Sequence, residues 1–472
     1  MTHAAPQPTI AAPWQSSELI ITAPATGEVI ETIVPASIAD LDVVVSRARK
    51  AQPEWAENEN YRRELLHRLA DLTELHADEL IALGARETGK PSLFAGIEPH
   101  WSAEHLRWIA DAQLPPAPEF EVGGEHIRVE RTPMGVVGAI IPWNVPMVMA
   151  VHKFAAAARM GNTVIIKPSP FTPLATRRWV QLAQQVLPEG VLQIVIGHDD
   201  LGKALVSHPG VDMIAFTGST ATGQSIMRAA AEDLKPLALE LGGNDAAIVL
   251  PDAPIEQFAQ DLFMGAFLLS GQVCQAIKRL YVHRSQYERL GQLLAQLAAA
   301  QVLGGPEDAG ATFGPLVTKA QHERVSILVE DARSRGARIL TGGKSADRPG
   351  NFYEPTILLD VPDDARIVVE EQFGPALPVL VYDDVEEAME RANSSKYGLG
   401  GSIWTADIDT GTKLARRLQT GSVWVNAHAT IHPAVNFGGV KHSGLGREGG
   451  VEGLLGYSEL QTIHLPGIAA GA

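Results

Sequence analysis

Apolar side chains recur along this chain at two spacings, one typical of helices and the other of buried strands. In residues 37–56, 60–88 and 99–112 they are three or four positions apart, as on the buried face of a helix. Residues 1–35 show only short apolar runs, which favour an irregular arm with short strands. The pattern therefore predicts three helices that follow this arm.

A segment of alternating, mostly polar side chains comes next, after a run of prolines that breaks the chain. Residues 119–132 contain the pair Gly123-Gly124 at a position that favours a tight turn, so they predict a β-hairpin. Both faces of this hairpin are polar, and we expect it to project from the body and pair with another subunit. A last strand expected at residues 460–465 could join it.

Between Gly135 and Glu240 the chain alternates between strand-like and helix-like runs. The expected strands are 136–141, 163–167, 192–196, 213–216 and 237–241, and the expected helices are 147–160, 173–186, 200–208 and 219–232. Such alternation predicts a parallel sheet with helices on both faces. Ligands of such sheets bind beyond the carboxyl ends of the strands, so the loops 142–146, 167–173 and 217–223 are expected to be the informative ones.

Residues 246–425 repeat the alternation and predict a second α/β domain. The expected strands are 246–249, 279–283, 378–381, 401–404 and 422–426. This domain carries Cys274, the only cysteine of the chain.

Composition and charge exclude several classes of protein. The chain has 472 residues, 45% of them hydrophobic and 20% charged, as in globular proteins with a large core. Its net charge of −17 argues against a nucleic-acid partner, and no apolar run reaches the length of a membrane span. The N-terminal stretch lacks the basic start and apolar core of a signal peptide, and a lone cysteine excludes an internal disulfide. We therefore expect a cytoplasmic protein.

The stretch 267–279, FLLSGQVCQAIKR, places that cysteine on a Gly-containing turn between a helix-like run at 257–269 and a strand-like run at 280–283. A thiol held firmly there, yet open to approach, is the setting that a nucleophile needs. Most lone cysteines instead pack as small hydrophobic side chains, so both interpretations stand at this point.

Three motif matches do not lead to a site. GLGREG, from Gly444 to Gly449, fits a dinucleotide fingerprint but follows no strand, so it is interpreted as a flexible loop. GSTATGQS, from Gly218 to Ser225, resembles a phosphate loop but has Gln224 where the lysine is required; its strand–loop–helix setting still suits a pyrophosphate. A histidine pair at 428 and 432 lacks a third ligand, so no metal is expected.

Seven motifs in a fixed order carry a resemblance to a known family. They are PWNVP at 142–146, VIIKPSP at 164–170, FTGST at 216–220, LELGG at 239–243, GQVC at 271–274, EEQFGP at 370–375 and NFGGVKHSGLGRE at 436–448. Together they resemble the aldehyde dehydrogenase superfamily over nearly the whole chain.

The resemblance implies an α/β fold with three parts. A Rossmann-type dinucleotide-binding domain would comprise residues 1–114 and 134–241, and an α/β catalytic domain residues 242–450. Residues 115–133 and 451–472 would form a β oligomerisation arm. A homodimer or homotetramer is therefore expected.

For catalysis, the resemblance implies that Cys274 attacks an aldehyde and forms a thiohemiacetal. The Asn144 amide and the Cys274 backbone N–H would stabilise the oxyanion, and Glu240 would activate water to hydrolyse the thioester. From the residues alone, Asn144 could be a turn residue and Glu240 a solvated carboxylate at a strand end. Its apolar flanks instead favour a partly buried Glu240 at a sheet edge, with a raised pKa.

The cofactor implied is NAD or NADP. Its expected contacts are Trp143, Lys167, Ser169, Pro170, Gly218, Ser219, Leu241, Glu371 and Phe373. Lys167 would hold the adenine ribose (or be an ordinary surface lysine), Ser219 and Gly218 the pyrophosphate, and Glu371 the nicotinamide ribose. NAD-preferring relatives often have a glutamate where this chain has Pro170, so NADP is expected to be accepted.

Two further departures and a set of tunnel positions complete the comparison. Many relatives have asparagine at the position of Leu269, and a lysine is common where this chain has Asn244-Asp245. The residues that match the family's substrate tunnel are Val145, Met149, His152, Leu268, Ile431 and Phe437. Because several of these positions are aromatic in relatives that take small aldehydes, we expect a medium or bulky, largely apolar aldehyde.

Alternative functions remain open on the sequence. A coenzyme A-acylating semialdehyde dehydrogenase shares the fold but usually lacks the base, which here is Glu240. A catalytically silent binding protein would be expected to lose Cys274, Glu240 or Asn144, and all three are present. A thioester or ester hydrolase activity of the same cysteine would need no cofactor.

Overall fold

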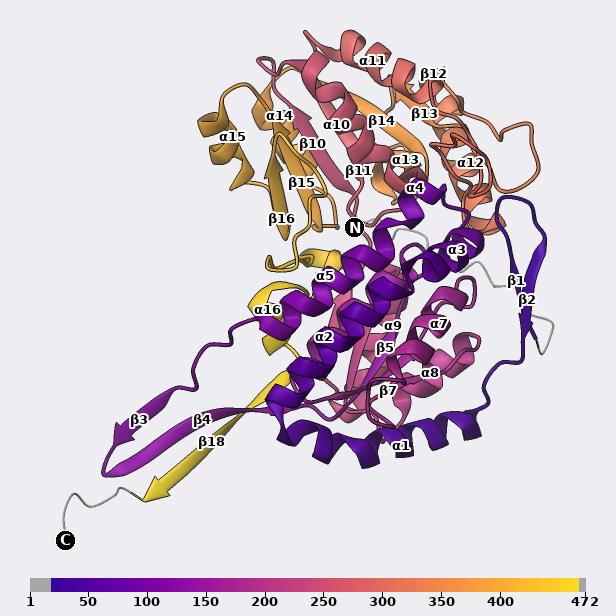
Figure 1. Cartoon of the computed structure of the whole chain (residues 1–472). Coiled ribbons are helices and arrows are strands. Elements are labelled where there is room, and N and C mark those ends of the chain that lie inside the picture. The colour runs from indigo at the N-terminus through magenta and orange to yellow at the C-terminus, as the bar shows by residue number, and fades with distance from the viewer. Residues whose placement is uncertain (1–17, 467–472) are drawn as a thin grey trace.

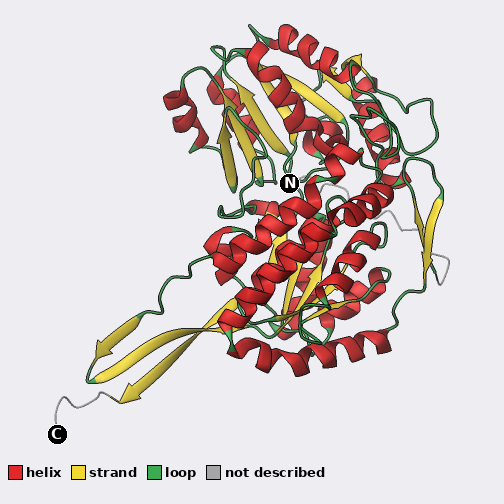
Figure 2. Cartoon of the chain, in the orientation of Figure 1, coloured by secondary structure: helices red, strands yellow, loops and turns green. Residues whose placement is uncertain are grey.

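The computed structural model describes residues 18–466; the N-terminal stretch assessed above for a signal peptide and the terminal GIAAGA lie outside these residues. The helices are α1 Ile38–Glu57, α2 Glu59–Leu75, α3 Ala77–Thr88, α4 Ser92–Ala95, α5 Ile97–Asp111, α6 Pro146–Arg159, α7 Leu174–Ala183, α8 Asp199–Ser207, α9 Thr220–Ala230, α10 Ile255–Phe267, α11 Tyr287–Ala299, α12 Lys319–Ser334, α13 Arg366–Val369, α14 Val385–Asn393, α15 Ile408–Ala415 and α16 Gly450–Leu455. The strands are β1 Leu19–Thr22, β2 Val29–Ile33, β3 Glu119–Val122, β4 Glu125–Pro133, β5 Val136–Ile140, β6 Thr163–Lys167, β7 Leu192–Ile194, β8 Met213–Thr217, β9 Leu237–Glu240, β10 Asp245–Val249, β11 Ile277–His283, β12 Arg338–Thr341, β13 Thr356–Leu359, β14 Ala376–Tyr382, β15 Gly400–Trp404, β16 Ser422–Val425, β17 Gly444–Leu445 and β18 Ser458–Pro466. Figures 1 and 2 show their arrangement.

The first large sheet has the strand order β17-β9-β8-β5-β6-β7 and is parallel except for β17. Successive side chains of a strand point to opposite faces, and both faces are covered. In β6, Val164 and Ile166 pack with α2, α5, α6 and α7, whereas Ile165 packs with α1 and α8. The expected parallel sheet with helices on both faces is confirmed.

The second large sheet has the order β12-β13-β14-β11-β10-β15-β16, and only β12 runs antiparallel to its neighbour. Helices α10 and α11 cover one face, and α12, α14 and α15 cover the other. All five strands expected in this region are present. The expectation missed β12 and β13, which are four residues long and lie at one end of the sheet.

The polar hairpin is present as β3 and β4, and β18 pairs with β4 along its whole length, as expected. Gly123 and Gly124 both have positive φ, 61° and 85°, which a two-residue hairpin turn requires and glycine adopts without strain. Figure 1 shows that this three-stranded sheet projects from the body.

Three expectations need correction. Residues 60–88 form two helices, because the chain leaves the helical conformation at His76 between α2 and α3. The segment 444–449 is not a loop throughout, because Gly444-Leu445 forms β17 and pairs with β9. For the same reason β9 is not an edge strand, so Glu240 does not lie at the sheet edge. The boundaries of the three domains stay a prediction.

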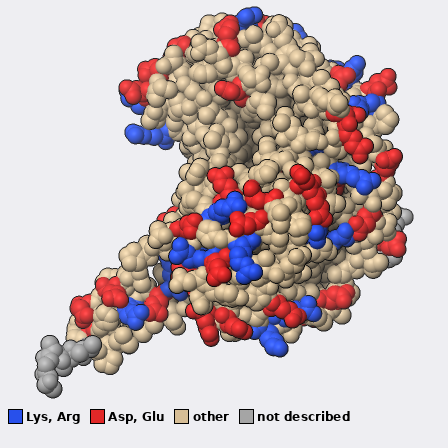
Figure 3. Space-filling model, in the orientation of Figure 1, with Lys and Arg blue, Asp and Glu red and all other residues tan. Residues whose placement is uncertain are grey.

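The loops expected to bind ligands follow β5, β6 and β8, which are neighbours in the first sheet. Their carboxyl ends lie on the side of the first sheet from which β9 leads into β10 of the second sheet. Figure 3 shows a hollow on the face in view, between the two α/β parts, with few charged residues in it. Within residues 18–466, no helix is both long enough and apolar enough to cross a membrane.

Candidate active site

The loop that carries Cys274 has an unusual backbone. After α10, the residues Leu269, Ser270 and Gly271 all have left-handed conformations, with φ of 51°, 58° and 71°. Only the glycine adopts this region without cost, so the loop stores strain that its contacts must hold. The Ser270 hydroxyl donates to the Gly314 carbonyl at 2.8 Å, and the Gln272 side chain accepts from the Val317 N–H at 3.0 Å. The cysteine is thus presented on a short, firmly attached loop.

Cys274 itself is half-buried. Burial raises the pKa of its thiol to about 12; Lys278 opposes this shift, whereas Glu371, Asp245 and Glu240 add to it. In the free protein the thiol is therefore protonated at neutral pH, and a reaction needs a group that takes its proton.

Asn144 is buried on the loop between β5 and α6. Its side-chain Nδ2 donates to the Gln272 carbonyl at 2.9 Å, which fixes the amide against the loop of Cys274. A side-chain amide has two N–H donors, so one remains for a ligand. The structure therefore brings together two residues that are 130 positions apart in the sequence.

Glu240 ends β9 and is buried, only 5% exposed. Burial raises the pKa of this carboxyl well above its usual range, and the charge of Glu448 raises it further, while Lys153 opposes the shift. Its Oε2 has no hydrogen-bond partner among the described residues, and an added Cβ on Gly438 would lie 2.7 Å from its Oε1. A buried carboxyl with one oxygen free of hydrogen bonds is suited to accept and release a proton.

A charged group beside Glu240 was missed by the sequence reasoning. Lys153 is fully buried on α6 and forms an ion pair with Glu448, whose other oxygen lies 3.5 Å from His152 Nδ1. Lys153 and His152 hold the pKa of Glu448 below its usual range, although burial alone would raise it. The sequence does show a lysine within the apolar run of α6, but it does not show the partner of this lysine, because Glu448 is 295 positions away.

The residues expected near the adenosine end lie at the end of β6 and on the loop that follows it. Lys167 is 4% exposed, which corrects the alternative of an ordinary surface lysine. Burial lowers the pKa of its ammonium to about 8, against the opposing charges of Asp199 and Asp200. Ser169 is buried, and Pro170 is half-buried beside it without any charge.

The residues expected near the pyrophosphate lie at the start of α9. Ser219 is the N-cap, and its hydroxyl accepts from the Thr222 N–H at 3.2 Å. The remaining N–H groups of a helix start favour an anion. Gly218 donates to the Glu240 carbonyl at 3.0 Å, and Leu241 is buried on the next loop and donates to the Ser443 carbonyl.

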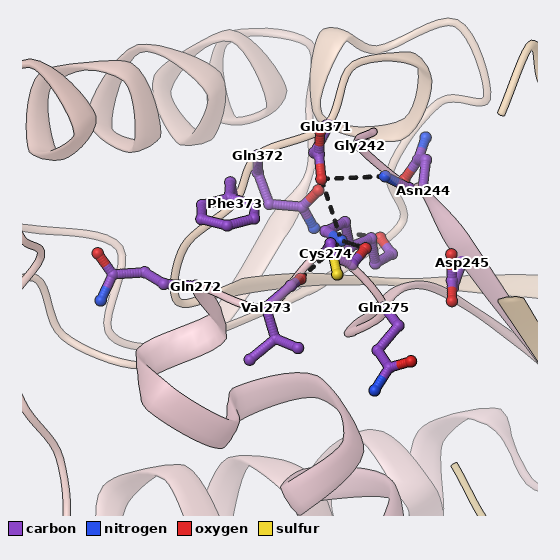
Figure 4. A network of polar contacts seen from close by, with 12 residues as sticks. Gly242, Asn244, Asp245, Gln272, Val273, Cys274, Gln275, Glu371, Gln372 and Phe373 are labelled. Carbon is purple, nitrogen blue, oxygen red and sulfur yellow. Dashed lines mark hydrogen bonds and ion pairs between the residues drawn. The ribbon is translucent and has the colours of Figure 1, made fainter. Parts of the chain in front are cut away.

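Glu371 and Phe373 lie on the segment before β14, and Trp143 lies on the loop after β5. Figure 4 shows Glu371 and Phe373 close to Cys274. Glu371 Oε1 accepts from the Gly243 N–H at 3.2 Å and pairs with Lys278 at 3.3 Å. The rings of Trp143 and Phe373 meet edge to face with their centroids 5.3 Å apart. A carboxylate and two rings are a suitable set for a ribose and an aromatic base.

Of the six residues matched to a substrate tunnel, three lie together at the start of α6 and three lie on other segments. Val145, Met149 and His152 share one face at the start of α6, because they are four and three positions apart. His152 stacks on His105, with ring centroids 4.0 Å apart, and on Trp101. The other three tunnel positions are Leu268 after α10, the 38% exposed Ile431, and Phe437, which bridges to Glu448. The tunnel stays a prediction.

Residues 18–466 contain no group of three or more His, Cys, Asp or Glu side chains arranged to hold a metal ion. His428 instead hydrogen-bonds Ser402 and the Gln275 carbonyl, while its expected companion His432 is exposed.

Comparison with known proteins places this geometry in a family. A sequence model of the Aldehyde dehydrogenase family matches residues 13–463. A mitochondrial aldehyde dehydrogenase of Leishmania tarentolae is 41% identical over 452 residues, which cover 93% of this chain and 90% of that protein. A phenylacetaldehyde dehydrogenase of Pseudomonas fluorescens is 39% identical over 459 residues, with 93% and 91% covered.

Solved structures agree. The NAD+ complex of an aldehyde dehydrogenase from Bacillus cereus superposes with a TM-score of 0.92 at 38% identity and covers 95% of this chain and 93% of that one. The α/β fold, the ordered motifs and these relatives agree: the chain belongs to the aldehyde dehydrogenase family.

Proposed function

We propose that this enzyme oxidises an aldehyde to the carboxylic acid through a thioester on Cys274, with NAD or NADP as the oxidant. The observation that carries the proposal is the joint placement of a thiol on a strained loop, an amide fixed against that loop, and a buried carboxyl within electrostatic reach. These are the three groups that acyl transfer through a cysteine requires.

In the first step, the Cys274 sulfur forms a bond to the aldehyde carbon while the carbonyl oxygen takes up the electron pair. The free N–H of Asn144 and the backbone N–H of Cys274 donate to that oxygen. Because burial keeps the resting thiol protonated, its proton must leave as the bond forms. We assign that proton to solvent, which reaches the half-buried thiol, so that Glu240 stays free as the base of the hydrolysis step.

In the last step, Glu240 removes a proton from water, and the resulting hydroxide attacks the thioester carbon. The C–S bond breaks, the acid leaves, and Cys274 regains a proton. Burial is the main cause of the raised pKa of Glu240; the neighbouring Glu448 raises this pKa further and Lys153 lowers it, so this pair adjusts the pH at which Glu240 can act as a base.

The residues present fit a dinucleotide cofactor, because a helix start with a serine cap, a buried lysine and a carboxylate near Cys274 are the groups that a pyrophosphate and two riboses need. Ser219 would hold the pyrophosphate, Lys167 the adenine ribose and Glu371 the other ribose. When bound, the cofactor supplies a hydride acceptor. Pro170 carries no negative charge where NAD-preferring relatives often have a glutamate. Asp199 and Asp200 also act on Lys167 and partly offset this difference, and we propose that NADP is accepted as well as NAD.

For the substrate, we propose a medium or bulky, largely apolar aldehyde. Four of the expected tunnel positions, Val145, Met149, Leu268 and Ile431, have aliphatic side chains. The hollow in Figure 3 is lined mainly by uncharged residues. A relative at 39% identity is a phenylacetaldehyde dehydrogenase, which agrees with a substrate of that size.

We further propose that the arm formed by β3, β4 and β18 joins subunits into a dimer or tetramer. Its exposed side chains include Phe120, Val122 and Leu460, at 50%, 58% and 62% exposure. Large apolar side chains this exposed are common at subunit interfaces.

The test is formation of reduced cofactor with a panel of aliphatic and aromatic aldehydes, with NAD and with NADP. Cys274→Ala should abolish it, and Glu240→Gln should accumulate an acyl-enzyme that mass spectrometry detects as added mass on Cys274. A folded, cofactor-binding wild type that is inactive with every aldehyde would contradict the proposal. Product formation that requires coenzyme A would favour the acylating alternative.

A further inference from the structure

Lys278 lies directly behind the nucleophile, at the second position of β11, and takes no part in the reaction described above. The side chain is buried, with 1% of the residue exposed. Its Nζ turns back toward the loop and donates to the Val273 carbonyl at 2.9 Å and to the Cys274 carbonyl. The same atom pairs with Glu371 Oε1 at 3.3 Å.

These three contacts use all the donors that an ammonium group has. A buried lysine is costly unless it is paired and hydrogen-bonded, and here both conditions are met. The acceptors belong to only two segments, the loop that carries Cys274 and the loop that carries Glu371. A lysine that contributed only to packing would not be expected to join these two segments in particular.

The surroundings show why a positive charge is useful at this position. Glu371 is a buried carboxyl that also accepts from the Gly243 N–H. Asp245 is also buried, and Lys278 counteracts the rise that burial imposes on the pKa of this carboxyl. Phe373, two residues after Glu371, lies with its ring centroid 5.8 Å from the Lys278 ammonium. Without Lys278 the nucleophile would face unbalanced negative charge.

We propose that Lys278 is a positioning residue that ties the cofactor-binding carboxylate of Glu371 to the backbone of the nucleophile, so that the ribose site and the thiol are held in one geometry. This inference rests on the proposed function for the role of Glu371. Figure 4 shows Val273, Glu371 and Phe373 around Cys274.

The experiment compares Lys278→Met and Lys278→Gln with a matched control. Lys235 is also buried, donates to two carbonyls, those of Val206 and His208, and pairs with Asp233, but it precedes β9, at the end of that strand opposite Glu240. Lys235→Met therefore measures the effect of losing a buried lysine as such. Lys278→Gln keeps N–H donors without the charge and serves where the methionine variant fails to fold.

The first readout is alkylation of Cys274, which requires no substrate. The rates are measured with neutral iodoacetamide and with anionic iodoacetate. Loss of the Lys278 charge should lower the iodoacetate-to-iodoacetamide rate ratio about tenfold, the factor that corresponds to one pKa unit of electrostatic interaction. Glu371→Gln should move the ratio in the opposite direction. A loop that was merely loosened would change both rates by the same factor.

The second readout is cofactor binding, measured by quenching of tryptophan fluorescence. Both Lys278 variants should weaken it at least about fivefold, as expected for a coupling of about 1 kcal/mol between two sites. The inference is overturned if a folded Lys278 variant keeps both the wild-type rate ratio and the wild-type cofactor affinity. It is also overturned if Lys235→Met lowers the rate ratio and the cofactor affinity as much as the Lys278 variants do. Failure of the proposed oxidation itself would appear instead as a wild type that is inactive with every aldehyde.

Discussion

Alanine in place of Gly242 should displace the Glu371 carboxylate and leave the fold intact. An added Cβ would lie 2.1 Å from Glu371 Oε2 and 3.0 Å from its Cδ. The backbone at Gly242 is outside the left-handed region, so alanine is not strained by its own conformation. The atom in the way is the end of a flexible side chain, and it can move.

The size of the displacement follows from the contact distance. A carbon and an oxygen approach no closer than about 3.3 Å, so the carboxylate must shift by about 1 Å. Such a shift lengthens its hydrogen bond to the Gly243 N–H, now 3.2 Å, and its ion pair with Lys278, now 3.3 Å. A misplacement of about 1 Å near reacting groups can lower activity by about 100-fold. The free energy of unfolding should change by no more than about 1 kcal/mol, because a glycine-to-alanine change also restricts the unfolded chain.

The assay is the initial rate at varied NAD and NADP concentration, together with the melting temperature. Gly242→Ala should lower kcat/KM for the cofactor 10- to 100-fold, on the order of 1.4 to 2.7 kcal/mol. Gly84→Ala on α3 is the control, because its Cβ would meet only Ala175 Cβ at 3.7 Å, an ordinary contact. If Gly242→Ala kept both the wild-type cofactor kinetics and the wild-type melting temperature, the observed position of Glu371 would have no bearing on cofactor use.

Three further changes test other parts of the site, and the pH dependence of the wild type tests its base. Burial and Glu448 raise the pKa of Glu240, and only its ionised form is a base, so the rate of thioester hydrolysis should rise over a pH range above that of an ordinary carboxyl; a rate that is already constant once an ordinary carboxyl has ionised, at about pH 5 to 6, would disprove this. Glu448→Gln removes the like charge and should shift that pH profile to lower pH by about one unit, as stopped-flow acyl-enzyme decay would show. Pro170→Glu should shift the ratio of kcat/KM toward NAD by repelling a 2′-phosphate, and an unchanged NADP/NAD ratio would contradict it. Leu269→Asn should raise the unfolding free energy by up to about 1 kcal/mol, because asparagine tolerates the left-handed conformation at φ 51°; calorimetry showing no gain would refute the strain argument.

Most of the fold was predictable because its elements have a local origin. The parallel strands are runs of branched side chains such as TVIIK in β6, and the breaks between elements contain glycine and proline. The arm was predictable for the same reason, since Gly123-Gly124 identifies the turn. The strands that were missed, β12, β13 and β17, have two to four residues, and their pairing depends on neighbours that are remote in the sequence.

The candidate site divides in the same way. The sequence alone was enough to select four site residues, because each belongs to one of the seven ordered motifs; they are Cys274, Glu240, Asn144 and Glu371. The roles of these residues stay proposals. The sequence did not point to Lys278, because a lone lysine next to an arginine is usual on a protein surface.

The sequence by itself therefore determined the types and order of the elements, and the loops that carry the reactive residues, because turns and periodicity act over a few residues. Only the tertiary structure decided which distant groups meet. It placed Lys153 against Glu448, 295 positions away, and buried Glu240 next to that pair. Burial and the nearness of charges set the pKa of a carboxyl, and both depend on packing in three dimensions. The chemical state of the site is thus a property of the folded chain and cannot be derived from any single motif.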